Sequence, residues 1–203
     1  MTRLESIFER SKKSGKKILV VYIPAGVPDT STTRRFFNEV IDVGADIVIL
    51  GIPFSESIAD NPLMQAASQV AIKNGTSAYR VVSLIKDYRR ITDAPIIVRS
   101  YINNLISYGF KFGNDYNGFE RFVTEAKIAG LDGLILADVP IDESEPFRQV
   151  CIKKNIRLID SVLQSPFSET KIVSTELIEF LLNSDVAGAV SLVRSIREKL
   201  DNA

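Results

Sequence analysis

The sequence predicts an α/β protein built as a (β/α) barrel of the TIM type, incomplete by about two strand–helix units near the C-terminus. First, β-branched runs alternate with amphipathic stretches without hairpin turns, which indicates a parallel sheet with crossover helices. Second, neither Gly-x-Gly-x-x-Gly nor a phosphate-loop motif is present, so the usual marks of open nucleotide-binding sheets are missing. Third, 203 residues house roughly six or seven of the eight units, here as a single domain over residues 1–203.

Short β-branched runs bounded by Gly, Pro or Asp predict buried parallel strands. These runs are Ile18–Ile23, Asp46–Leu50, Pro95–Val98, Gly133–Leu136 and Arg157–Val162. The amphipathic stretches between them predict helices. Helices are expected around Leu4–Phe8, over Phe36–Ile41 up to Gly44, from Asn61 and Pro62 to Gly75, around Val81–Tyr88, and over Phe119–Ala126 up to Gly130.

The C-terminal part is where the predicted barrel is short. After the fifth strand, two consecutive helices are expected, around Glu176–Asn183 and along Val190–Leu200. At most one brief strand, Lys171–Val173, precedes them. Phosphate-binding loops of such barrels follow the last two strands and are glycine-rich. Beyond Gly133 the chain has one glycine, Gly188.

Composition excludes several classes of function. Twenty-five basic and 25 acidic residues leave no surplus of positive charge for holding nucleic acid. The chain has no histidine, so a Ser-His-Asp triad and His-ligated metals are excluded, and the single Cys151, predicted to be a buried helical residue, cannot form a zinc site. No run reaches the ~18 apolar residues of a membrane span. We expect a cytoplasmic protein without a metal or cofactor.

Two loops that follow predicted strands are unusually long and acidic: residues 51–62 and 137–147. Taken singly, each is compatible with an acidic approach to a helix N-terminus. Together with Tyr22–Asp29 and Tyr101–Asn103 they closely resemble the α subunit of tryptophan synthase, from about Leu4 to Ile156. The specific signatures are Gly44-Ala45-Asp46 leading to Pro53-Phe54-Ser55 and Ala59-Asp60, and Gly130-Leu131-Asp132-Gly133 leading to Asp138-Val139-Pro140.

The resemblance implies a lyase without a Schiff base. That family cleaves indole-3-glycerol phosphate into indole and glyceraldehyde 3-phosphate, and the indole passes to a partner β subunit. One carboxylate must move protons, and a second must hold the indole N–H as positive charge develops. The second role falls on Asp60, the one catalytic residue the resemblance carries over. The first falls on the position that Ile49 occupies here, so lyase activity is expected to be low or absent.

No other acid is well placed to replace the missing one. Asp46 points away from position 49 because side chains alternate along a strand, and Glu56 would need a large swing of its loop. Ser57 and Asn61 stand where the family has proline and glycine. Arg99 stands in the apolar indole pocket, so it must find a carboxylate such as Asp60 or turn away.

The resemblance also implies two further sets of residues. The substrate-binding set comprises Tyr22, Tyr101, Ile135, Ala137 and Thr175, where Thr175 matches a phosphate-contacting serine. The set expected at the β-subunit interface comprises Pro53, Phe54, Asn103 and Pro140. The family's sixth and seventh strands have no counterpart in the sequence.

Three hypotheses about function remain at this stage. The chain is a lyase of this type with impaired activity, or a catalytically degenerate relative that binds only a β-subunit partner. The third hypothesis is a different phosphate-binding barrel enzyme that reuses Asp60. The sequence opposes it, because it offers neither a second acid nor a glycine-rich loop.

Overall fold

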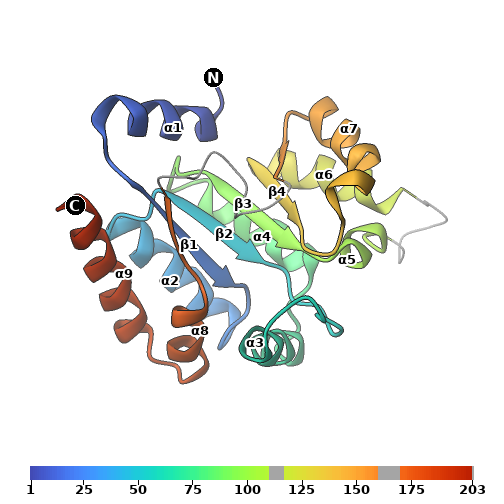
Figure 1. The fold of residues 1–203 in the computed structure, drawn as a ribbon. Helices are drawn as coiled ribbons and strands as arrows, with labels where there is room; N and C mark the ends of the chain where they lie inside the picture. Colours follow the sequence, from blue (N-terminus) through green and yellow to red (C-terminus); the bar gives the residue numbers. More distant parts are fainter. Residues whose placement is uncertain (110–116, 160–169, 203) are drawn as a thin grey trace.

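A computed structural model of the chain describes residues 1–109, 117–159 and 170–202, and contains a six-stranded parallel sheet surrounded by helices (Figure 1). The strand order is β5-β4-β3-β2-β1-β6. The strands are β1 (Ile18–Pro24), β2 (Ile47–Gly51), β3 (Ile96–Ser100), β4 (Gly133–Leu136), β5 (Arg157–Leu158) and β6 (Thr170–Val173). All five predicted strand positions are therefore confirmed, although residues 160–162 of the fifth lie outside the described part of the chain.

The helices connect the strands and cover the sheet. They are α1 (Arg3–Ser14), α2 (Thr30–Asp42), α3 (Pro62–Lys73), α4 (Ala78–Tyr88), α5 (Ile102–Ile106), α6 (Gly118–Ala129), η2 (Ile141–Glu143), α7 (Glu145–Lys153), α8 (Thr175–Leu182) and α9 (Val186–Asp201). The short α5 was not predicted, and α9 begins four residues before the expected Val190. Cys151 is buried in α7, as predicted, and its burial raises the pKa of the thiol to about 12.

Within the described residues, the strand order is that of a parallel barrel whose two end strands do not meet. In a closed barrel the last strand pairs with the first. Here β6 pairs with β1, with Ile18 opposite Thr170 and Val21 opposite Val173. Among the described residues, β5 and β6 are the two ends of the sheet, so two strands between them would complete eight. The predicted incomplete barrel and the brief strand near Lys171–Val173 are thus confirmed.

The strands are buried on both faces, and helices cover the outer one. Every residue of β1, β2 and β4 is buried, which explains why these strands appear in the sequence as continuous apolar runs. On the outer face, Phe36 and Phe37 of α2 are completely buried, and Phe37 stacks on Tyr88 of α4. Within the described residues, no helix is long and apolar enough to cross a membrane.

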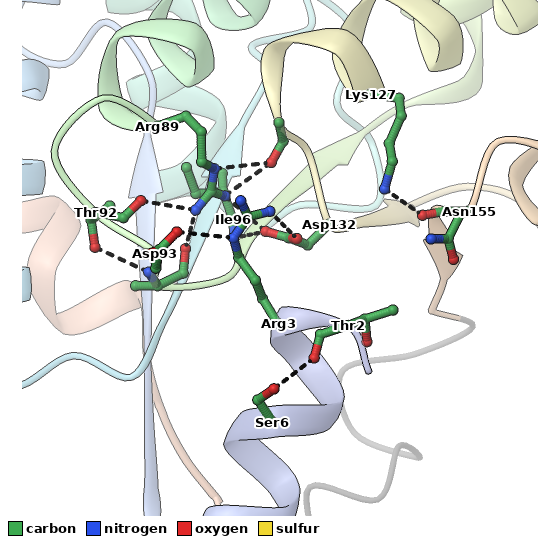
Figure 2. Close-up of polar contacts among 12 residues, drawn as sticks. Thr2, Arg3, Ser6, Arg89, Thr92, Asp93, Ile96, Lys127, Asp132 and Asn155 are labelled. Atoms are coloured by element: carbon green, nitrogen blue, oxygen red, sulfur yellow. Dashed lines mark hydrogen bonds and ion pairs between the residues drawn. The ribbon is translucent and has the colours of Figure 1, made fainter.

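Two carboxylates, the half-buried Asp46 and the buried Asp132, tie helices to the N-terminal ends of the strands. Asp46, just before β2, accepts hydrogen bonds from the Leu19 amide at 2.9 Å and from Arg197 of α9 at 3.0 Å. Asp132, just before β4, accepts from Arg89 at 2.8 Å, from Arg3 of α1 at 3.2 Å and from the Ile96 amide at 3.0 Å (Figure 2). Charge-assisted hydrogen bonds of this kind stabilise more than neutral ones, so these residues fix the base of the barrel.

Asp29 caps α2 and gives a pH-dependent contribution to stability. Hydrogen bonds from Ser31 and Thr32 lower the pKa of Asp29 to about 2. A carboxylate whose pKa is lower in the folded state contributes stability that is complete above its unfolded pKa, about 3.9, and is lost as the pH falls. We expect the stability advantage of the wild type over Asp29→Asn to be constant above about pH 5 and to shrink below about pH 4.

Urea unfolding at a series of pH values measures this difference. The exposed Asp142→Asn provides the control, because Asp142 lies in η2 away from this cap. Parallel pH curves for the wild type and Asp29→Asn would contradict the assignment.

Candidate functional site

The candidate site lies at the C-terminal ends of the strands, on the face of the sheet that we call the inner face. Strand register defines this face: Tyr22 lies opposite Ile49, and Ile49 lies opposite Ile97. One step further along, Gly51 lies opposite Arg99, and Arg99 lies opposite Ile135. Residues opposite one another in parallel strands project to the same side, so these side chains share one space.

Ile49 occupies the centre of β2 on this face. Its side chain is 3% exposed and lies between the strands that carry Tyr22 and Ile97. A hydrocarbon at this point can neither donate nor accept a proton. Asp46 lies at the opposite end of the same strand, bonded to Arg197, and Glu56 is exposed to solvent. Neither acid reaches the position of Ile49, as the sequence predicted.

The main polar feature of the site is an ion pair between Asp60 and Arg99. Asp60 comes from the loop between β2 and α3, and its Oδ1 accepts a hydrogen bond from Arg99 Nη2 at 2.6 Å. The Asp60 side chain is 4% exposed and that of Arg99 is 19% exposed. Of the two expectations for Arg99, pairing with Asp60 is the one that the structure adopts.

Arg99 remains charged in this environment. Burial lowers the pKa of its guanidinium, but the neighbouring Tyr22 and the hydrogen bond to Asp60 outweigh burial and raise the pKa above its ordinary value. Arg99 therefore carries its positive charge throughout the physiological pH range.

Tyr22 lies against the ion pair because Gly51 leaves room for it. A Cβ on Gly51 would come within 2.0 Å of the Tyr22 hydroxyl oxygen, so any side chain at position 51 would displace the tyrosine. Burial, reinforced by the charge of Asp60 and opposed by Arg99, raises the pKa of Tyr22 to about 12. The hydroxyl is neutral at physiological pH and is a weak proton acceptor.

Tyr101 forms the second aromatic wall of the site. It follows β3, is 2% exposed, and its ring centroid lies 5.8 Å from Arg99 Cζ. Burial and the negative charge of Asp60 both raise the pKa of Tyr101. Phe54 stacks on Tyr101 with 5.1 Å between ring centroids, which joins the loop after β2 to the end of β3.

The loop that carries Asp60 is held by Gln65, which the sequence did not identify, and by Asn61, the expected N-cap of α3. Gln65 of α3 donates to the backbone carbonyls of Asp60 at 2.9 Å and of Ser57 at 3.3 Å. Asn61 caps α3 through the Met64 amide and donates from Nδ2 to Thr175 Oγ1 at 3.4 Å. Thr175, the predicted phosphate-contacting residue, therefore lies next to the Asp60 loop at the start of α8.

The remaining predicted residues are distributed along the same end of the sheet. Ile135 is buried on the inner face beside Arg99, and Ala137 extends β4 with its amide donating to Ser100 at 2.9 Å. Pro53 is buried, and its carbonyl accepts from Asn104 at 3.1 Å. Of the four predicted partner contacts, Phe54 is half-buried, and Asn103 and Pro140 are exposed.

Arg99, Tyr22 and Tyr101 can contact a ligand in this site. However, among the described residues the site lacks a side chain that can act as a general acid–base. Asp60 and Arg99 neutralise each other, and both tyrosines have pKa values above their ordinary range. Within residues 1–109, 117–159 and 170–202, no three acidic or cysteine side chains lie close enough together to hold a metal ion.

Comparisons with known proteins agree on one family. The family described as Tryptophan synthase alpha chain matches residues 8–201. A tryptophan synthase alpha chain from Geotalea uraniireducens is 36% identical over 159 residues, which cover 78% of this chain and 56% of that protein. One from Caldanaerobacter subterraneus subsp. tengcongensis is 37% identical over 172 residues, covering 85% of this chain and 62% of that protein. The chain thus spans less than two thirds of either relative.

The fold comparison points in the same direction. The crystal structure of tryptophan synthase subunit alpha from Legionella pneumophila str. Paris superposes with a TM-score of 0.89 at 22% identity, covering 100% of both chains. At this identity the likeness concerns the fold, and it supports the incomplete α/β barrel described above.

Proposed function

Because this chain belongs to the tryptophan synthase alpha chain family, we propose that it is an α-type protein of tryptophan biosynthesis with severely impaired aldol cleavage of indole-3-glycerol phosphate. We place this role in the cytoplasm. The observation that carries the proposal is the 2.6 Å ion pair between Arg99 and Asp60, formed beside Ile49.

Aldol cleavage without a Schiff base depends on two acidic groups. A general acid–base must take the proton of the glycerol hydroxyl and deliver one to the indole ring carbon. Ile49 stands at the position that the family resemblance assigns to this group, and its side chain is buried hydrocarbon. Loss of general acid–base catalysis alone lowers a rate by about 10²–10⁴.

The second acidic group is present but engaged elsewhere. Asp60 would need a free carboxylate oxygen directed at the indole N–H, whereas its Oδ1 is bound to Arg99. A charge-assisted bond to a guanidinium is stronger than one to a neutral N–H, so indole competes poorly for this oxygen. The guanidinium also occupies space beside Tyr101 that a flat, apolar ring would need.

We expect indole release from indole-3-glycerol phosphate to be at least about 10²-fold slower than that of a complete α chain under the same conditions. The α chain from Geotalea uraniireducens is a suitable reference. The chain contains six tyrosines and no tryptophan, so released indole can be followed by its fluorescence without a tryptophan background from this chain. Turnover within tenfold of the reference, with or without a β subunit, would contradict the proposal.

A second candidate function is binding of a β-subunit partner without cleavage. The loop after β2 keeps its shape through the Phe54–Tyr101 stack and the Asn104 bond to Pro53, neither of which needs substrate. Three isoleucines at the same end of the sheet, Ile58, Ile106 and Ile141, are 87%, 49% and 50% exposed. They follow the neighbouring strands β2, β3 and β4, and contiguous exposed apolar side chains are typical of an interface. Light scattering of a mixture with a β subunit tests this function separately from turnover.

A further inference from the structure

A cavity lies at the N-terminal ends of the strands, at the opposite end of the sheet from the Asp60–Arg99 pair. Its volume is about 570 Å³, within the range of small-molecule sites. The first turn of α1, the C-terminal end of α6, and the turn from α7 into β5 surround it. Figure 2 shows part of this region, with Arg3, Lys127 and Asp132. Nothing in the proposed lyase chemistry uses this end of the molecule.

Three cationic side chains line this cavity: Arg3, Lys127 and Arg157. Lys127 Nζ donates to the Asn155 carbonyl at 2.7 Å and retains two further donors. In the part of the chain that the structure describes, Arg157 forms no ion pair within 4.0 Å. Its charged neighbour is Glu5, whose pKa is lowered by the Thr2 backbone amide and, more weakly, by the charge of Arg157.

The two acids that line the cavity already have internal partners. Asp132 is shared by Arg3 and Arg89, at 3.2 and 2.8 Å, and also accepts the Ile96 amide. Glu5 accepts the Thr2 amide at 2.7 Å in the capping box of α1. Asp132 is thus occupied by its own partners, and among the side chains that line the cavity three cations face two acids, which leaves a surplus of positive charge.

We propose that this cavity binds a small anion that carries a phosphate group. Arg157, at the start of β5, and Lys127, near the C-terminal end of α6, both provide donors to the cavity, and an arginine fork matches the oxygens of a phosphate. The buried Ile156 and the exposed Ile152 line the same cavity, and the organic part of such a molecule packs against them. This site does not depend on the lyase proposal, because it shares no residue with the Asp60–Arg99 pair.

Titration calorimetry of the full chain with inorganic pyrophosphate tests the proposal, with sodium chloride used to hold the ionic strength constant. We expect saturable binding to one site. Arg157→Gln should weaken it about tenfold, the effect of losing a hydrogen bond to a charged group. Lys153→Gln on α7 is the matched control, since Lys153 is exposed and outside the cavity, and it should leave the affinity unchanged.

Glu5→Gln separates a specific site from general destabilisation. Glutamine preserves the capping box of α1 while removing a negative charge from the cavity. We expect pyrophosphate to bind about threefold more tightly to this variant, since one like charge is removed at a distance of several ångströms. Absence of saturable binding, an equal loss in Lys153→Gln, or unchanged affinity in both Arg157→Gln and Glu5→Gln would each overturn the proposal.

Discussion

Asp60→Ala is expected to lower the free energy of unfolding by about 3 kcal/mol or more, the usual cost of removing one partner from a buried ion pair. The reason is that Arg99, 19% exposed, would keep its charge without a carboxylate beside it. In a lyase whose aspartate only holds substrate, removal of the same carboxylate would leave no buried charge behind. The size of the effect therefore reports whether Asp60 is a structural partner here. Urea unfolding monitored by circular dichroism measures it.

The double variant Asp60→Ala/Arg99→Leu provides the stronger comparison. Replacing both members of a buried pair with apolar residues is often neutral or stabilising. We expect the double variant to regain most of the stability lost by Asp60→Ala, which gives a large coupling energy in a double-mutant cycle. Glu56→Ala, on the same loop but exposed, controls for loop perturbation and should change stability little. If the losses in the free energy of unfolding are additive in this cycle, the Asp60–Arg99 pair does not stabilise the loop.

Much of the fold could be predicted because its strands are buried on both faces. Val20, Ile47 and Ile97 sit in runs where every residue is apolar, so the strand positions are visible without any alternation. The missing units could also be located, because the C-terminal segment lacks β-branched runs apart from Lys171–Val173. The helix α5 could not be predicted, since its five residues are too few to establish a period.

The sequence predicted which residues belong to the site, but it did not predict which side chains contact one another. A guanidinium in an apolar pocket needs a carboxylate, so a partner for Arg99 was expected from chemistry alone. Whether that carboxylate is Asp60 depends on how the loop after β2 folds. Gln65 holds this loop by donating hydrogen bonds to two of its backbone carbonyls. Such side-chain to backbone bonds leave no periodic pattern in a sequence.

The placement of Tyr22 is indicated in the sequence by Gly51, although the prediction for Tyr22 did not use this glycine. Gly51 ends a strand of large apolar residues, and a glycine there indicates close approach by another group. The group is the Tyr22 hydroxyl, which occupies the space of the absent Cβ. From sequence alone, the glycine predicts an approach without identifying the residue that makes it.

Restoring the missing acid should not by itself restore catalysis. In Ile49→Glu the new carboxylate would lie one inward position below Arg99, on the strand next to it. An opposite charge within ~4–6 Å favours the ionised carboxylate and lowers its pKa, which makes it a poor proton donor. We expect indole release by Ile49→Glu to remain near that of the wild type. Ile49→Gln, which has the same shape without the charge, is the control.

The double variant Ile49→Glu/Arg99→Leu supplies the missing acid and also removes the guanidinium that binds Asp60. Leucine at position 99 frees Asp60 to accept an indole N–H and gives the ring an apolar surface, while the glutamate, without a neighbouring cation, can exchange protons. We expect indole release to rise by about 10²–10⁴ over Arg99→Leu alone, the contribution of a general acid–base. Indole binding to Arg99→Leu, measured by fluorescence anisotropy, checks the pocket independently of turnover. A double variant that binds indole but does not cleave would place the remaining defect in the absent strand–helix units, whereas full rescue by Ile49→Glu alone would show that Arg99 does not block the site.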